Sequence, residues 1–219
     1  MDLAPGYTAR WHILNGKPVP EGPPLDFVMA ALASSLGPVS GVIDEDDETH
    51  DEPAEQVEQS PSPVRAYNEF PHTTPNKGGT MKPQGIVFHS SYGSAAGSVH
   101  WIKNPVSKVS YHTMIFPDGA RHNLVPFNVV AWHAGRSTFR GRSGCNSFTI
   151  GLAFEGDLYQ RTLSEDEIAS AVEISVRLMR KYGIGLEWVT DHRTISPGRK
   201  ADLPPQVLAM LKERIEAAL

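Results

Sequence analysis

Short apolar runs separated by polar turns dominate the chain from residue 85 onward. Five of these runs have the length of buried strands: residues 86–88, 109–116, 129–132, 148–154 and 188–190. The turn Pro117-Asp118-Gly119 follows the second run, so residues 121–125 are expected to return as its hairpin partner. The pattern predicts a sheet whose strands are largely buried.

Helical spacing of apolar residues appears in two longer segments. The first is bounded by Ser164 as N-cap, with Glu167 as its capping-box partner, and by Gly183 as the stop. The second carries an apolar stripe made of Val207, Leu211, Ile215 and Leu219. Strands and helices alternate without a strict βαβ rhythm, which predicts an α/β fold with a single mixed β-sheet flanked by helices.

The N-terminal part differs in character from the rest of the chain. Residues 1–43 are too few for an independent core and form an extension of unknown role, with a short strand expected near Trp11 and a short helix over residues 26–36. Residues 44–79 are predicted to be a linker, because residues 44–59 contain nine Asp or Glu without any Lys or Arg and are followed by a stretch with several prolines and glycines. The catalytic domain is therefore expected over residues 80–219.

Composition excludes two classes of protein. No apolar run reaches the roughly 18–20 residues that span a bilayer, so no membrane span is predicted. The N-terminus has no basic stretch followed by an apolar core, so synthesis in the cytoplasm without a signal peptide is expected. The single cysteine, Cys145, permits no intrachain disulfide, which excludes a disulfide-stapled secreted domain.

The net charge of −5 is unevenly distributed along the chain. Residues 60–219 carry 18 Lys and Arg against 13 Asp and Glu, because the acidic residues gather upstream. This mild positive balance suits an anionic polymer such as the bacterial cell wall, and a mere scatter of charges explains it equally well. No nucleic-acid partner is predicted, and a monomer is expected.

The sharpest local signal is a proline- and glycine-containing loop that joins His192 to Asp202 and follows a predicted strand. A catalytic zinc site uses three protein ligands, with nitrogen or oxygen at about 2.0–2.2 Å, and leaves a fourth position for water. His89 ends another predicted strand and is placed to be the third ligand. Taken alone, each of the nine histidines would more often be a surface or core residue.

Five sequence blocks follow one another between residues 80 and 205. They are Ile86-Val87-Phe88-His89-Ser90, Ser110-Tyr111-His112 ahead of Pro117-Asp118-Gly119, Ala131-Trp132-His133-Ala134-Gly135, Cys145-Asn146-Ser147-Phe148-Thr149-Ile150-Gly151, and the loop from His192 to Asp202. In this order they resemble the N-acetylmuramoyl-L-alanine amidase family, which includes phage lysozyme-like amidases, bacterial muropeptide amidases and animal peptidoglycan recognition proteins.

The resemblance implies a metal site and two catalytic residues. Zinc (Zn2+) would be bound by His89, His192 and Asp202. Tyr111 would sit beside the zinc-bound water, and Lys200 would face the scissile carbonyl oxygen. Such a site is chemically coherent, because zinc acidifies water and polarises an amide carbonyl while a lysine cation stabilises the developing oxyanion.

The chain departs from part of this family at one position. The muropeptide-recycling branch carries a catalytic glutamate where this chain has Ala153, and Glu155 falls on a later glutamate of that branch. Residues two apart on a strand are about 6.6–6.8 Å apart, so Glu155 cannot simply replace the missing carboxylate. Phage and animal members also lack this glutamate and keep a tyrosine, here Tyr111, but commonly use cysteine in place of Asp202. The chain therefore mixes two patterns.

The predicted function is zinc-dependent hydrolysis of the amide bond between N-acetylmuramic acid and L-alanine in peptidoglycan, by a phage or prophage endolysin acting on the cell wall. His133 and Asn146 are expected to contact the substrate. Two alternatives stay open: a peptidoglycan-binding protein that does not cut, and a zinc carboxypeptidase acting on the stem peptide.

Overall fold

The computed structural model describes residues 11–14, 17–20 and 67–219. Strands β1 (Trp11–Leu14) and β2 (Lys17–Pro20) form an antiparallel hairpin, which confirms the strand expected near Trp11. This hairpin belongs to one compact unit, residues 1–60, and the candidate site belongs to a second unit, residues 61–219. The helix expected over residues 26–36 lies outside the described residues.

A mixed six-stranded sheet is the centre of the second unit, and its strand order is β12-β5-β11-β6-β7-β3. The strands are β3 (Glu69–Pro71), β5 (Gly85–Ser90), β6 (Thr113–Ile115), β7 (Arg121–Asn123), β11 (Thr149–Phe154) and β12 (Val189–Asp191). Strands β12, β5, β11 and β6 run parallel, whereas β7 is antiparallel to β6 as the predicted hairpin requires. The predicted mixed sheet flanked by helices is confirmed.

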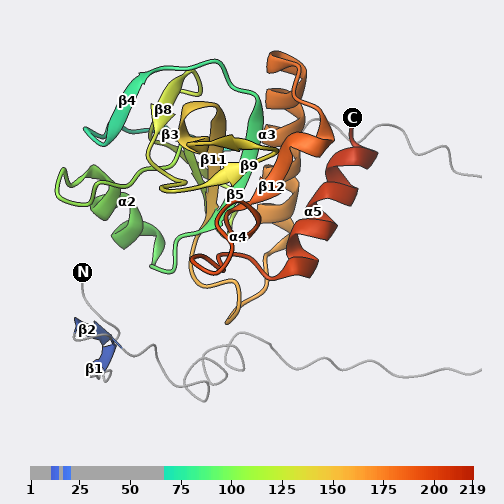
Figure 1. The fold of residues 1–219 in the computed structure, drawn as a ribbon. Coiled ribbons are helices and arrows are strands. Elements are labelled where there is room, and N and C mark those ends of the chain that lie inside the picture. Colours follow the sequence, from blue (N-terminus) through green and yellow to red (C-terminus); the bar gives the residue numbers. More distant parts are fainter. Residues whose placement is uncertain (1–10, 15–16, 21–66) are drawn as a thin grey trace, which may run out of the picture. The chain divides into compact units, whose positions relative to one another are not determined.

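Two helices cover one face of this sheet: α3 (Glu165–Tyr182) and α5 (Pro205–Ala217) lie beside each other in Figure 1. Helix α3 has the predicted capping box between Ser164 and Glu167, and it ends at Gly183 with a φ of 68°. Alternate residues of the central strands, such as Phe88 and Leu152, pack against these helices in the main core. Because these residues face the helices, their neighbours along each strand point to the opposite face of the sheet.

The opposite face is covered by α2 (Ala95–Lys103) and by a small antiparallel sheet of β4 (Lys77–Thr80) and β8 (Val129–Ala131). His89 and Ala153 are register partners on β5 and β11, and each is the chain neighbour of a residue that faces the main core. Since successive strand residues alternate between faces, His89 and Ala153 point away from α3 and α5. Strand β5 thus brings His89 to the second face.

Part of the stretch expected to be linker belongs to the fold. Strand β3 pairs in parallel with β7 at one edge of the main sheet, and β4 pairs with β8. The carboxylate of Glu69 accepts hydrogen bonds from Arg121 (3.3 Å) and Arg177 (3.0 Å). This segment lacks apolar periodicity because main-chain pairing and ion pairs, rather than a buried apolar face, hold it in place. Two strands of the fold therefore lie within the stretch expected to be linker, upstream of residue 81.

The remaining elements are short. They are the hairpin of β9 (Thr138–Phe139) and β10 (Arg142–Ser143), the single turns η1 (Cys145–Ser147) and η2 (Leu186–Trp188), and the short helix α4 (His192–Ile195). Only Thr113–Ile115 of the strand predicted over residues 109–116 is in the sheet ladder. Within the described residues, no helix is long and apolar enough to cross a bilayer.

Candidate functional site

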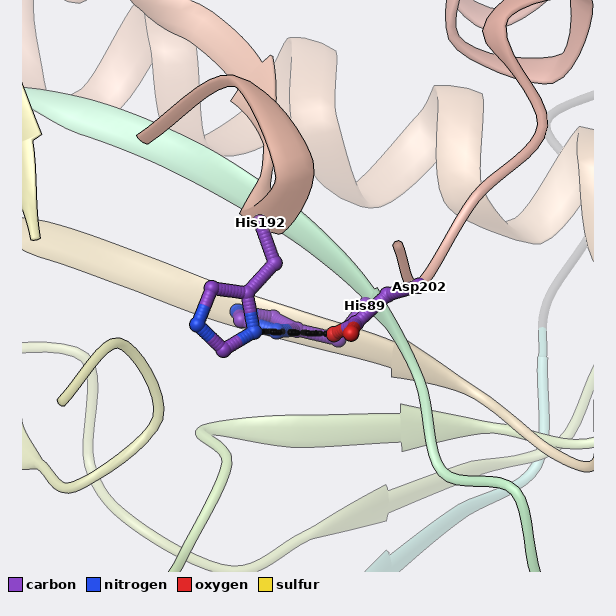
Figure 2. A group of neighbouring side chains, drawn as sticks. All are labelled: His89, His192 and Asp202. Atoms are coloured by element: carbon purple, nitrogen blue, oxygen red, sulfur yellow. Dashed lines mark hydrogen bonds and ion pairs between the residues drawn. The ribbon is translucent and has the colours of Figure 1, made fainter. Parts of the chain in front are cut away.

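Three predicted ligands meet where two parallel strands end. His89 is next to last in β5, and His192 follows directly after β12 as the first residue of α4. Because β5 and β12 are parallel neighbours, their carboxyl ends lie at the same edge of the sheet. Asp202 comes from the loop before α5, and Figure 2 shows the three side chains pointing toward one another.

The three ligand atoms form a small triangle. His89 Nδ1 lies 3.0 Å from His192 Nδ1 and 3.1 Å from Asp202 Oδ2, and His192 Nδ1 lies 2.9 Å from the same oxygen. Ligand atoms of one zinc ion lie roughly 3.3 Å apart, because each bond is about 2.0–2.2 Å long and the arrangement is tetrahedral. The cluster therefore has the dimensions of a metal site.

The chemistry of these side chains also fits a divalent cation. All three are buried, and burial lowers the pKa of His89 to about 4, so its imidazole is neutral at pH 7 and can be a ligand. The second carboxylate oxygen of Asp202, Oδ1, is buried without a hydrogen-bond partner in the described part of the protein. A buried oxygen without a partner is costly, and a bound cation would satisfy it.

A cavity of about 270 Å³ opens beside the three ligands. It is lined by Ser90, Ser91, Tyr92, Lys108, Val109, Tyr111, Trp132, His133, Gly135, His192, Arg199, Lys200 and Asp202. The predicted catalytic residues Tyr111 and Lys200 are both present. The ring centroid of Tyr111 lies 5.1 Å from that of His89, and Lys200 is exposed to solvent.

Burial raises the pKa of Tyr111 well above its usual value, so its hydroxyl stays protonated across the range in which proteins are stable. The group can donate a hydrogen bond and is not available as a base. Ala153 is buried beside His89 in register on β11, and Glu155 does not line the cavity. Among the residues that the structure describes around the cavity, Asp202 is the only carboxylate.

Asn146 does not contact the cavity, contrary to the expectation that it binds substrate. Its side-chain oxygen accepts hydrogen bonds from the backbone N–H groups of His133 (3.0 Å) and Ala134 (2.7 Å). These two hydrogen bonds fix the backbone conformation at His133 and Ala134, so Asn146 stabilises the loop that follows β8. His133 lines the cavity, and both of its ring nitrogens face protein atoms.

Three residues near the site were missed by sequence reasoning. A Cβ added to Gly151 would lie 2.5 Å from Cγ of His133, so glycine is needed for that ring to pack on β11. A glycine inside a buried strand signals such a close approach, and this signal was readable. Tyr92 and Lys108 enter the cavity from backbone positions with φ of 59° and 52°, which no sequence pattern indicates.

Comparisons with known proteins identify a family for this chain. Residues 79–205 match the family model described as N-acetylmuramoyl-L-alanine amidase. The 1,6-anhydro-N-acetylmuramyl-L-alanine amidase AmpD of Salmonella typhimurium is 38% identical over 99 residues, which cover 45% of this chain and 52% of AmpD. The amidase AmiD of Escherichia coli is 29% identical over 113 residues, covering 45% of this chain and 41% of AmiD.

Solved structures share the fold. A selenomethionine crystal structure of AmpD superposes with a TM-score of 0.60 at 24% identity, covering 71% of this chain and 97% of that one. The catalytic domain of XlyA gives 0.54 at 25% identity, covering 68% and 99%. The chain spans about half the length of the curated relatives it matches. Because the family model matches more than half of the chain, this protein belongs to the N-acetylmuramoyl-L-alanine amidase family.

Proposed function

We propose that this protein is a zinc-dependent amidase that hydrolyses the bond between N-acetylmuramic acid and L-alanine in peptidoglycan. The observation that supports this most strongly is the buried triangle of His89, His192 and Asp202 beside a cavity that also holds Tyr111 and Lys200. Relatives that are 38% and 29% identical over about half of this chain are named as amidases of this kind, which favours the same chemistry here.

His89, His192 and Asp202 would hold the zinc ion. When bound there, zinc would supply Lewis-acid chemistry, which lowers the pKa of a water molecule and polarises the amide carbonyl. Lys200 projects into the same cavity from the loop that carries Asp202. Its ammonium group would stabilise negative charge as it develops on the carbonyl oxygen.

Tyr111 is the proposed proton-handling or water-orienting residue. Its hydroxyl is neutral, so it would donate a hydrogen bond to the attacking oxygen or to the scissile amide. The methyl group of Ala153 cannot take a proton, and Asp202 is occupied as a ligand. Tyr111 is therefore an uncharged donor beside the proposed metal ligands, whereas the hydroxyl of Tyr92, which also lines the cavity, donates to the backbone oxygen of Ala201 (3.1 Å).

The cavity suits an anionic substrate. Lys108, Arg199 and Lys200 line it, and Lys108 and Lys200 are exposed. Arg199 is partly engaged, because its guanidinium donates to the backbone oxygens of Ala134 (2.8 Å) and Arg136 (3.0 Å). Carboxylates of the peptidoglycan stem peptide would be attracted by this positive field.

We propose further that the protein acts on the assembled cell wall, as a phage or prophage endolysin does. The curated relative named for 1,6-anhydro substrates suggests small muropeptides as the competing substrate class. Parallel assays on purified cell-wall sacculi and on soluble 1,6-anhydro muropeptides would separate the two. Release from sacculi at a rate comparable with that on soluble substrate supports the lytic role, and cleavage of soluble substrate alone contradicts it.

The experiment that tests the chemistry is digestion of purified cell wall by the zinc-loaded full-length chain, followed by mass spectrometry. An amidase releases stem peptides with a new amino group on L-alanine and leaves intact glycan. A zinc carboxypeptidase would instead release C-terminal amino acids, and a binding protein would release nothing. His192→Ala is the matched variant, and retention of full zinc content and activity by this variant would show that the site is assigned wrongly.

A further inference from the structure

One short loop contacts both histidines of the proposed zinc site through the ring nitrogens that face away from Asp202. His89 Nε2 lies 3.0 Å from His133 Nδ1, and His192 Nε2 lies 3.2 Å from the backbone oxygen of Ala134. We infer that His133 and Ala134, fixed by Asn146, set the tautomers of both histidine ligands so that each Nδ1 presents a lone pair to the metal. This inference rests on the proposed zinc site.

The proton positions follow from one carbonyl group. The backbone oxygen of Thr149 lies 3.0 Å from His133 Nε2, and because a carbonyl can only accept, that nitrogen carries the proton. A neutral imidazole has one N–H, so His133 Nδ1 is an acceptor. His89 Nε2 must then be the donor, which leaves His89 Nδ1 without a proton. The carbonyl group of Thr149 thus determines the tautomer of His89, to which it is connected by two hydrogen bonds through His133.

His192 reaches the same state by a shorter route. The carbonyl oxygen of Ala134 can only accept, so His192 Nε2 carries the proton and His192 Nδ1 is free of it. Arg199 Nη2 also lies 3.3 Å from His192 Nε2, but its two N–H groups have nearer acceptors at 2.8 Å, the backbone oxygen of Ala134 and Ser196 Oγ. The guanidinium of Arg199 donates to the Ala134 oxygen at 2.8 Å, which uses its second lone pair. Both Nδ1 nitrogens therefore face Asp202 Oδ2 as acceptors, and a cation between the three atoms satisfies all of them.

The loop is held in this position by two further residues. Asn146 Oδ1 accepts the backbone N–H groups of His133 and Ala134, so the side chain of one and the carbonyl of the other are fixed together. Gly151 gives the His133 ring its space, because a side chain there would reach within 2.5 Å of the ring. These contacts explain why neither His133 nor Asn146 needs to touch substrate to matter.

Without these contacts, the proposed ligands could form hydrogen bonds with one another instead of binding a metal ion. A proton on Nδ1 of His89 or His192 could be donated to Asp202 at 3.1 or 2.9 Å, and that hydrogen bond would compete with metal binding. Residues around a metal site commonly prevent this by accepting the distant N–H of each histidine ligand. His133 and Asn146 are thus positioning residues for the metal ligands.

The first test measures zinc affinity of full-length variants by competition with a chromogenic chelator. In His133→Leu the acceptor is lost, and zinc should bind roughly 10–100-fold more weakly. In the matched variant His133→Asn an oxygen stands near the position of Nδ1 and can accept from His89, so affinity should stay within a few-fold of wild type. Equal affinities of wild type and His133→Leu would overturn the inference.

The second test needs no variant and no turnover. Long-range proton–nitrogen NMR of the metal-free wild-type chain reports which ring nitrogen of each histidine is protonated. Protonated Nε2 in both His89 and His192 is the expected result, and a proton on Nδ1 of either one would contradict the inference. If the wild-type protein binds no zinc, the proposed function is wrong. The tautomers measured by NMR would still show whether His133 and Ala134 set the protonation of His89 and His192.

Discussion

At the scale of single residues, position 153 bears on which group would handle a proton in the proposed reaction. Ala153 lies beside His89 in register and is fully buried, so neither its own side chain nor a water resting on it can take the place of a carboxylate. Tyr111 packs against the buried apolar cluster that contains Ala153, and it also lines the cavity. Catalysis would then depend on a hydrogen-bond donor rather than on a second acid.

Replacing Tyr111 with phenylalanine tests this dependence. The variant Tyr111→Phe keeps the ring and loses only the hydroxyl, so kcat should fall roughly 10²–10⁴-fold while zinc content stays unchanged. Steady-state kinetics on a soluble muropeptide and metal analysis of the same sample measure both. Tyr182→Phe, at the end of α3, is the control and should behave as wild type. An unimpaired Tyr111→Phe enzyme would transfer the role to another residue.

Gly151 is a second test at this scale. In Gly151→Ala the new methyl group would displace the His133 ring, whose Cγ would be 2.5 Å away, and zinc affinity should fall because His89 loses its partner. Gly79→Ala is the matched control, since an added Cβ meets nothing within 4 Å there. Chelator competition on both variants measures the difference. Equal zinc affinities would show that the ring can move without consequence.

The sequence identified more of the proposed metal ligands than of the residues around them. His89, His192 and Asp202 were found because they end strands or bound a loop in a recognisable order, and the structure brings them within 3.1 Å of one another. Asn146 was assigned to substrate because it lies in the same blocks. Its real partners are two backbone N–H groups, and such contacts between distant loops leave no periodic pattern.

At the scale of elements, His112 joins the two sheets that enclose the site. Its Nδ1 accepts the backbone N–H of Gly151 on β11 (2.9 Å), and its Nε2 donates to the carbonyl of Val129 on β8 (2.9 Å). Both ring nitrogens of His112 are thus bound to backbone groups, which is the pattern of a structural histidine. The apolar run over residues 109–116 suggested a longer strand, but its first half makes single backbone hydrogen bonds, from Ser110 to Trp132 (3.1 Å) and from His112 to Gly151 (2.9 Å), in addition to the side-chain bonds of His112.

This bridge predicts a pH dependence of stability. Burial lowers the pKa of His112 to about 4 in the folded protein, whereas its ordinary value is 6.5. Between these values the unfolded chain binds more protons, so stability is fully present above pH 6.5 and is lost as the pH falls toward 4. One such imidazole contributes up to about 3 kcal/mol to the free energy of unfolding at neutral pH.

Urea unfolding of metal-free protein between pH 7 and 4.5 measures this effect. His89 and His133 are also buried and shift in the same direction, so the comparison must be with a variant. His112→Asn keeps an acceptor for Gly151 and cannot titrate. This variant should be less stable than wild type at pH 7. Its free energy of unfolding should fall less steeply as the pH is lowered, and the difference in slope should be at most that caused by binding one proton. Identical slopes would mean that His112 is not buried neutral in solution.

At the scale of the whole molecule, the extent of the catalytic domain is the point on which sequence reasoning fell short. Composition separates the acidic, proline-bearing stretch from the rest, but it does not show where main-chain pairing begins. Strand β3 has the sequence Glu69-Phe70-Pro71, with all three residues exposed, and it belongs to the main sheet nonetheless. We propose that the domain extends from about residue 67 to residue 219 and that residues upstream serve another purpose.

Two truncated chains test this boundary. A chain beginning at residue 67 keeps β3 and β4 and should fold, bind zinc and cleave soluble muropeptides at near-normal rates. A chain beginning at residue 81 loses both strands, and it leaves the almost fully buried Arg121 without Glu69, although Ser170 and Glu173 still contact it. Removing one partner of a buried ion pair is costly, so this shorter chain should melt at lower temperature or aggregate.

The single substitution Glu69→Gln separates the ion pair from the strand. It keeps the pairing of β3 with β7 and removes the charge, so its melting temperature should lie between those of the two truncated chains. Circular dichroism during heating measures all three proteins against the full-length chain. If the chain from residue 81 matches the one from residue 67 in melting temperature and activity, β3 and β4 contribute nothing to the fold. If the chain from residue 67 fails to fold, the upstream residues are part of the catalytic domain.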